Sequence, residues 1–203
     1  MKNKLFILSI AMLFLSSCSK EIVKQESSIF RKTENIENST DSYVKYTILK
    51  DQQYCDKSIF VPVKYTELSF KVKFDSSAIY KTSEEKNQSD INKLFGFSDN
   101  NAAHHEYSAR FGWRWSDNAL RLFAYIYNNS VMSFKEIGIV KIGSENICSI
   151  KVDSNKYIFS LNKKEVIMPR ESTTTVGEGY KLFPYFGGDE LAPHDISIWI
   201  EEL

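Results

Sequence analysis

The chain has 203 residues, a length typical of one domain, and its 26 acidic and 26 basic residues give a formal net charge of zero. This balance gives no electrostatic reason to expect a nucleic-acid partner, and it argues against a membrane patch that relies on charge alone. Aromatic residues make up 14% of the chain, a share that favours packed β structure and flat contact surfaces.

The N-terminus has the pattern of an export signal. Lys2 and Lys4 form a basic start, and an almost wholly apolar run from Leu5 to Leu15 follows. An apolar run of about ten residues is too short for a stable membrane span and is typical of a signal-peptide core. The residues that end this run, Leu15-Ser16-Ser17-Cys18, resemble the lipobox of bacterial lipoproteins.

The lipobox resemblance implies that residues 1–17 are a signal peptide and that Cys18 is lipidated and becomes the first residue of the mature protein. An ordinary signal peptide followed by a chance cysteine is the alternative. Residues 18–42 are rich in polar residues and lack apolar periodicity, so they cannot bury enough surface to fold and are expected to form a flexible tether. We therefore expect an exported protein whose N-terminal lipid anchors it to a membrane of the bacterial envelope, at the outer membrane.

After the tether, apolar and polar residues alternate in a series of short segments, which predicts β-strands. Turn residues separate the segments, as at 99–101 and 128–130. The best helix candidate, Ser83–Asn92, fits a loop equally well. Short strands at regular spacing predict one all-β domain over residues 43–203, a two-sheet antiparallel β-sandwich. The alternating sets are Leu68-Phe70-Val72-Phe74, Tyr107-Ala109-Phe111-Trp113, Leu120-Leu122-Ala124-Ile126, Cys148-Ile150-Val152, Tyr157-Phe159-Leu161 and Ile196-Ile198-Ile200.

Two cysteines remain besides Cys18. Cys148 belongs to an alternating set, so its side chain is predicted to point inward, whereas Cys55 lies in a polar stretch. An exported protein experiences oxidising conditions that permit a disulfide between them. Two free, buried or half-buried thiols are the simpler interpretation.

The strand pattern from about Lys93 to Ile200 includes Tyr157–Asn162, a strand that ends in a turn, and Tyr180–Phe183, which precedes the last isoleucine-rich strand. In this order of strands the chain resembles concanavalin A-like jelly rolls. The resemblance covers roughly half the chain and is one of pattern, not of motif. The group includes lectins, laminarinase-like hydrolases and polysaccharide lyases, so the resemblance implies a polysaccharide ligand, although a fold does not fix a function.

The strand over residues 120–127 has an unusual outward face. A solvent-exposed face normally carries Lys, Glu, Thr and Ser, but here it carries one arginine and three aromatic residues. Aromatic rings offer flat faces to sugars, and arginine donors suit the carboxylates of uronic sugars. We therefore predict an exposed, concave, glycan-binding face, with burial of both strand faces as the alternative. The predicted binding residues are Arg110, Arg121, Tyr125, Tyr127 and Tyr185.

Metal sites have weak signals. Asp189, Glu190 and Asp195 bring three carboxylates close together in the sequence, which suits calcium, but their spacing matches no EF-hand loop. A structural calcium is the only cofactor that this pattern allows, and we otherwise predict none. His104 and His105 are adjacent and would point to opposite faces of a strand, so a zinc site that also uses His194 is not favoured.

Catalytic motifs are also weak. The pattern Glu-x-Asp-x-x-Glu, which a retaining glycosidase of this fold would show, does not occur in the sequence. The segment Tyr180–Tyr185 is faintly similar to the Tyr-Phe-Lys-Ala-Gly strand of alginate-type lyases, but the Gln-Ile-His motif of that family is absent, and Ser108-Ala109-Arg110 departs from its Arg-x-Glu-x-Arg. In a lyase this similarity implies catalytic roles for Tyr185, His105, Arg110 and Lys181, since a cation must lower the tyrosine pKa from about 10.

Three functions therefore remain open. A glycan-binding lipoprotein is our first hypothesis, a polysaccharide lyase or other glycan-cleaving enzyme is the second, and a non-catalytic structural surface protein is the third. The three differ in what the concave face holds: an aromatic groove, a converging Tyr, His and Arg, or a dry and filled surface.

Overall fold

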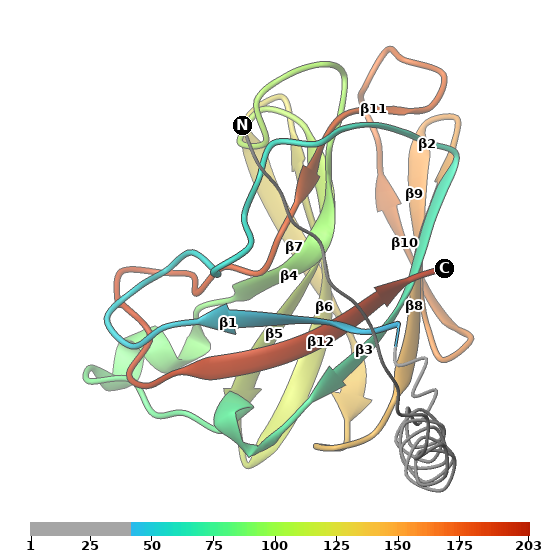
Figure 1. Ribbon diagram of the computed structural model, residues 1–203. Helices are drawn as coiled ribbons and strands as arrows, with labels where there is room; N and C mark the ends of the chain where they lie inside the picture. Colours follow the sequence, from blue (N-terminus) through green and yellow to red (C-terminus); the bar gives the residue numbers. More distant parts are fainter. Residues whose placement is uncertain (1–41) are drawn as a thin grey trace, which may run out of the picture. The chain divides into compact units, whose positions relative to one another are not determined.

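Two six-stranded antiparallel sheets face each other across a hydrophobic core in the computed structural model, which describes residues 42–203 (Figure 1). This confirms the predicted all-β sandwich. The predicted lipidation site, Cys18, lies outside the described residues. In spatial order the first sheet contains β1 (Val44–Ile48), β12 (Ile196–Glu202), β3 (Glu67–Phe74), β8 (Asn146–Asp153), β9 (Lys156–Leu161) and β10 (Lys164–Pro169).

The second sheet contains, in spatial order, β2 (Pro62–Tyr65), β11 (Gly177–Leu182), β4 (Asn92–Ser98), β5 (Ser108–Ser116), β6 (Ala119–Asn128) and β7 (Val131–Val140). The segment between β3 and β4 holds two short 3-10 helices, η1 (Ser76–Ala78) and η2 (Glu85–Ser89), so the helix candidate at 83–92 contains one irregular turn. Within residues 42–203, no helix is long and apolar enough to cross a membrane.

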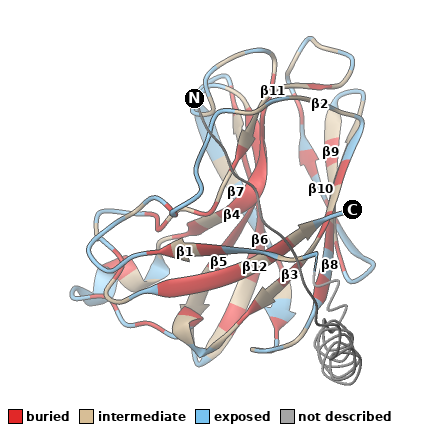
Figure 2. Cartoon of the chain, in the orientation of Figure 1, coloured by how far each residue is buried: buried red, intermediate tan, exposed pale blue. Residues whose placement is uncertain are grey.

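The core follows the predicted alternation. Phe70 of β3 and Phe159 of β9 pack edge-on against Phe111 of β5, with ring centroids 5.5 and 5.3 Å apart, so aromatic contacts join the two sheets. The buried residues concentrate in the strands of the two sheets (Figure 2). Trp113 is fully buried, as its alternating set predicted, and Trp115 packs against the core, whereas Tyr107 precedes β5 and is only half-buried.

Two-residue turns connect neighbouring strands. Asn129 and Ser130 both have positive φ angles, 46° and 66°, between β6 and β7, which is the geometry that matches the twist of a hairpin. Asp117 and Asn118 do the same between β5 and β6. Asparagine and aspartate tolerate this backbone region better than most residues, so turn chemistry sets the register of the strands that carry the site.

Both cysteines of the described part of the chain are free and buried. Burial raises the pKa of each thiol, and Cys148 faces the core as its alternation predicted. The simpler interpretation of these residues is therefore the correct one.

Candidate functional site

The outer face of the second sheet, which points away from the core, contains an open cavity of about 420 Å³. Its floor comes from β4, β5, β6 and β11, and its walls come from the loops around residues 54–60, 104–105 and 183–185. The lining residues are Tyr54, Ser58, Ile59, Phe60, Lys93, His104, His105, Arg110, Tyr125, Tyr127, Tyr180, Lys181, Leu182, Phe183, Pro184 and Tyr185. These include all but one of the residues predicted for binding or catalysis.

Arg110 and Tyr125 form the centre of the floor. They are directly opposite each other in the pairing of β5 with β6, so their side chains share one face. The Arg110 guanidinium lies 5.4 Å from the centre of the Tyr125 ring. Arg110 and Tyr125 are only 6% and 5% exposed, so the prediction of an exposed face is wrong for these two residues: neighbouring side chains and loops cover them.

Arg110 is a buried cation that has no carboxylate or hydrogen-bond partner among residues 42–203, although its guanidinium lies over the Tyr125 ring. Its Nε atom is buried and makes no hydrogen bond, and within residues 42–203 the guanidinium has no ion pair. Burial lowers the pKa of Arg110, and the nearby Tyr125 and Tyr127 oppose that effect. Arginine stays protonated in proteins, so the cavity floor carries a positive charge.

A second cation, Lys93, lies beside the first. Its Nζ donates to the Ile91 carbonyl oxygen over 2.7 Å and lies 4.9 Å from the centre of the Tyr125 ring. Burial, and next the charge of Arg110, lower the pKa of Lys93 to about 8. The ammonium is therefore still mostly charged at neutral pH but is close to losing its proton.

His104 and Tyr180 form a hydrogen-bonded pair in the cavity wall. The Tyr180 hydroxyl accepts from the backbone N–H of His104 over 3.1 Å and lies 2.8 Å from its Nδ1. Burial, followed by the charges of Arg110 and His105, lowers the pKa of His104 to about 4, so its ring is neutral at neutral pH. A neutral Nδ1 can accept a hydrogen bond from the Tyr180 hydroxyl, so the pair places a phenol and an imidazole side by side in the cavity wall.

His105 and Tyr127 extend this wall. The His105 ring lies 4.1 Å from the His104 ring and 5.4 Å from the Tyr127 ring, centroid to centroid. Burial and the charge of Arg110 lower the pKa of His105. The two adjacent histidines do not point to opposite faces as expected for a strand, because they lie in the turn that precedes β5.

Tyr185 and two exposed aromatic side chains form the rim. The Tyr185 hydroxyl donates to Gln53 Oε1 over 2.6 Å, and burial raises the Tyr185 pKa. The Tyr54 ring packs edge-on against Tyr185 at 4.9 Å, and Phe60 lies 5.4 Å from the Tyr180 ring. Tyr54 and Phe60 are 68% and 73% exposed, so both present open aromatic faces at the cavity mouth.

Arg121 is the predicted binding residue that does not line the cavity. It faces the predicted side of β6, but it lies four positions before Tyr125, a rise of about 13 Å along a strand. Its guanidinium pairs with Glu136 and Asp117, each over 3.1 Å. The prediction of a binding role for Arg121 is therefore corrected: alternation identified its face but not its neighbours.

Lys181 lines the cavity, yet its ammonium contacts the Glu202 carboxylate of β12. It alternates with Tyr180 and Leu182, so its side chain leaves the strand on the opposite side from theirs. An ammonium held by Glu202 is not directed at a ligand in the cavity. The lyase role predicted for Lys181 thus has no support in this geometry.

One end of the same sheet face is covered. Ile91 packs with Phe123 and Tyr125, and the Arg114 guanidinium donates to the Ser89 carbonyl oxygen over 2.6 Å. Gly112 permits this approach, since a Cβ atom there would lie 2.4 Å from the Ile91 side chain. The hypothesis of a filled face is therefore correct for this end, while the end with Arg110 and Tyr127 stays open.

Two of the three carboxylates considered for calcium, those of Glu190 and Asp195, are engaged separately. Glu190 accepts from the backbone N–H groups of Ser83 and Glu84, and Asp195 accepts from that of Lys50. Among residues 42–203, no group of three or more His, Cys, Asp or Glu side chains has an arrangement that could hold a metal ion. These carboxylates instead hold loops together.

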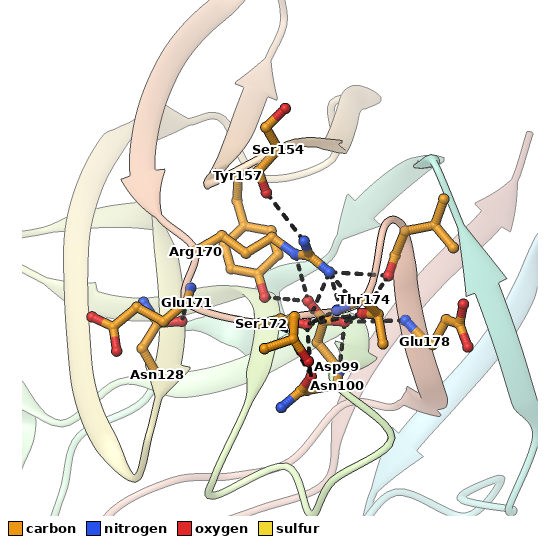
Figure 3. Close-up of polar contacts among 12 residues, drawn as sticks. Asp99, Asn100, Asn128, Ser154, Tyr157, Arg170, Glu171, Ser172, Thr174 and Glu178 are labelled. Atoms are coloured by element: carbon orange, nitrogen blue, oxygen red, sulfur yellow. Dashed lines mark hydrogen bonds and ion pairs between the residues drawn. The ribbon is translucent and has the colours of Figure 1, made fainter.

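A second buried arginine, Arg170, shows how this fold normally balances such a charge (Figure 3). Its Nε and Nη2 donate to the two carboxylate oxygens of Asp99 over 2.7 and 3.2 Å. Tyr157 donates to the same carboxylate over 2.6 Å. Burial alone would raise the pKa of Asp99, but the hydrogen bonds from Arg170 and Tyr157 outweigh it and lower that pKa.

Sequence reasoning missed several lining residues. Lys93 and His104 were not predicted as binding residues, and neither were the rim residues Tyr54 and Phe60. Tyr180 was noted only as part of a strand. The register of β4 shifts between Lys93 and Gly96, which breaks the alternation that would have assigned Lys93 to a face. No period-two pattern identifies loop residues, because their place depends on the tertiary structure.

The chain is similar to known proteins in its fold but not in its sequence. No protein-family model matches the chain, and no curated protein sequence matches it. The alginate lyase AlyC3 is similar with a TM-score of 0.55 at 9% identity over 79% of this chain and 74% of that chain. A family 16 glycoside hydrolase, an endo-glucanase from Bacteroides ovatus, gives 0.52 at 12% identity over 79% and 80%.

A third similar structure comes from work on endo-acting O-glycanases that human gut microbiota members express to initiate mucin breakdown. Its TM-score is 0.55 at 12% identity over 85% of this chain and 83% of that chain. Identities this low show the fold alone. The chain therefore has the jelly-roll sandwich fold that these glycan-active enzymes share, as its strand pattern predicted.

Proposed function

We propose that the domain over residues 42–203 binds a glycan in the cavity on the outer face of its second sheet. The observation that carries this proposal is the lining: five tyrosines, Phe60, two histidines and Arg110 surround one open cavity. Rings with polar tips suit sugars, because their faces stack on the apolar side of a sugar ring while their hydroxyls bond its hydroxyl groups. The similar structures named above, which act on glycans, support the same ligand class.

The N-terminal sequence supports an anchor for this domain. We propose that Cys18 carries lipid and that the following polar residues connect it to the sandwich. Acyl chains on one cysteine would hold the protein at a membrane. The whole chain would then be an envelope lipoprotein that captures polysaccharide near the cell.

A glycan array with purified full-length protein in detergent tests the binding proposal. We expect at least one polysaccharide to bind, and we expect Tyr127→Ala to weaken that binding. Tyr43→Ala is the matched control, since Tyr43 bonds to Glu145 and does not line the cavity. Equal losses in the two variants, or no binding to any glycan, would refute the proposal.

A second candidate function is polysaccharide lysis, and the His104–Tyr180 pair favours it. A lyase needs a base that removes a proton next to a carboxylate and a cation that stabilises the resulting charge. Tyr180 would supply the base, with His104 as its hydrogen-bond partner, and Arg110 would supply the cation. The ultraviolet absorbance of unsaturated products tests this activity: Tyr180→Phe should abolish product formation while leaving glycan binding intact. Wild-type protein that binds uronic polymers without forming such products would exclude a lyase that acts on them.

A further inference from the structure

The cavity is cationic in a chain that has no net charge. Arg110 and Lys93 both face it, and none of its sixteen lining residues is an aspartate or glutamate. Asp90 is the carboxylate whose charge reaches Lys93, where it opposes the lowering of the lysine pKa, but Asp90 does not line the cavity. Two neighbouring cations thus share a space that no carboxylate of residues 42–203 lines.

A buried cation without a partner is costly. Moving a charge out of water is unfavourable unless an opposite charge or hydrogen bonds compensate. The chain provides that compensation for Arg170, whose side chain is 1% exposed and whose partner Asp99 is 0% exposed. Among residues 42–203 it provides neither a carboxylate nor a hydrogen bond for Arg110, which is 6% exposed and has the Tyr125 ring beside its guanidinium. The contrast indicates that a ligand supplies the missing acceptor.

The free donors of Arg110 indicate the shape of that partner. Nε is buried and makes no hydrogen bond, whereas Nη1 and Nη2 are not enclosed and have no hydrogen-bond partner among residues 42–203, so these two donors are available for a bidentate acceptor. Two parallel N–H groups match the two oxygens of a planar carboxylate. Lys93, on the same floor, would contribute a second charge without a fixed geometry.

We propose that the sugar unit held in this cavity carries a carboxylate, so that the ligand is a uronic-acid-type glycan, and that Arg110 binds the carboxylate in a bidentate manner with Lys93 beside it. This inference rests on the proposed glycan-binding function and adds the charge and the class of the sugar. It also explains why the domain retains an uncompensated cation: the ligand completes an ion pair that is missing from the free protein.

Matched pairs of oligosaccharides test this directly. Oligogalacturonate, oligomannuronate, oligoguluronate and oligoglucuronate would each be compared with the counterpart in which every carboxylate is reduced to an alcohol. A sulfated galactan oligosaccharide serves as an anion of different geometry. Calorimetry on the full-length protein should show that at least one acid oligosaccharide binds, and that its reduced counterpart binds at least about tenfold more weakly, the loss expected when one charged contact is removed.

Variants of Arg110 give a second, independent readout. Arg110→Met should abolish binding of the acid oligosaccharide and at the same time raise the unfolding temperature of the free protein, because a buried charge without a partner is replaced by an apolar side chain. Arg110→Lys retains the charge but loses the bidentate geometry, so it should bind at least about tenfold more weakly. Arg114→Met is the control, since Arg114 does not line the cavity, and it should bind like the wild type.

The outcomes separate this inference from the proposed function. If reduced and acid oligosaccharides bind equally well and Tyr127→Ala still weakens both, the cavity binds glycan but the carboxylate is refuted. Binding of the sulfated galactan alone would refute the carboxylate in favour of sulfate. If no acid or neutral glycan binds, both proposals fail. Should Arg110→Met fail to fold, the comparison of acid and reduced ligands on wild-type protein still decides the question.

Discussion

Arg170 and Asp99 form a bidentate ion pair in which both side chains are removed from solvent, with exposures of 1% and 0%. The pair connects the end of β4 to the end of β10, because Asp99 directly follows β4 and Arg170 directly follows β10. Arg170 also donates to the carbonyl oxygens of Ser154 and Val176. A buried pair of this kind stabilises only as a unit, since removal of one partner leaves the other charge uncompensated.

Asp99→Asn should therefore lower the free energy of unfolding by about 3–5 kcal/mol, the cost of leaving a buried charge alone. Chemical denaturation monitored by tryptophan fluorescence would measure this change. Asp153→Asn removes a carboxylate from the exposed pair with Lys156 and should cost about 1 kcal/mol or less. Similar losses in the two variants would contradict the structural role assigned to the buried pair.

Replacing Tyr125 and Tyr127 by alanine should affect stability differently, although the two side chains share a face of β6. Tyr127 is half-buried at the cavity wall, so Tyr127→Ala should weaken glycan binding by about 1–3 kcal/mol with little loss of stability. Tyr125 is 5% exposed and packs against Phe123 and Ile91, so Tyr125→Ala should lower the unfolding temperature as well as the affinity.

Calorimetric binding and thermal unfolding on both variants would check this difference. Tyr125→Phe retains the packed ring and should restore most of the stability. A Tyr125→Ala variant as stable as the wild type would mean that its burial contributes nothing to the fold.

The affinity for an acidic glycan should decrease as the pH rises through about 8, the pKa of Lys93. The sign follows from charge: the ammonium attracts a carboxylate below this pH and is neutral above it. Arg110 stays charged throughout, so binding should weaken without disappearing. Lys93→Met should bind more weakly at neutral pH and lose this pH dependence, which calorimetry over the range from neutral to alkaline pH would show. If the affinity of Lys93→Met decreases by the same factor over this pH range, a group other than Lys93 causes the decrease.

Cys18→Ala should release the protein from membranes, because the lipobox cysteine is the residue that the lipoprotein resemblance implies is modified. Metabolic labelling with a fatty-acid probe and fractionation of the cells would measure this. Ser19→Ala, one residue later, should leave labelling unchanged. Labelling of Cys18→Ala at the wild-type level would show that the cysteine is not the lipidated residue.

The sequence by itself determined which residues share a face. Alternation assigned Leu122 and Ala124 to the core and placed Tyr125 and Tyr127 on the opposite side, because side chains of a strand point alternately to its two faces. Turn residues such as Asn129 marked where strands end. These features are local, so they can be recognised without knowledge of any other part of the chain.

The tertiary structure alone decided which of those residues form a site. Arg110 and Arg121 look alike in the sequence, yet Arg121 pairs with Glu136 and Asp117 while Arg110 pairs with no carboxylate of residues 42–203. Phe60 lies in a loop fifty positions before Arg110, and His104 lies in the turn that precedes the strand of Arg110, yet both line the cavity. Local periodicity encodes the face of a side chain, but burial and charge compensation depend on contacts between distant segments, and only the folded chain establishes those contacts.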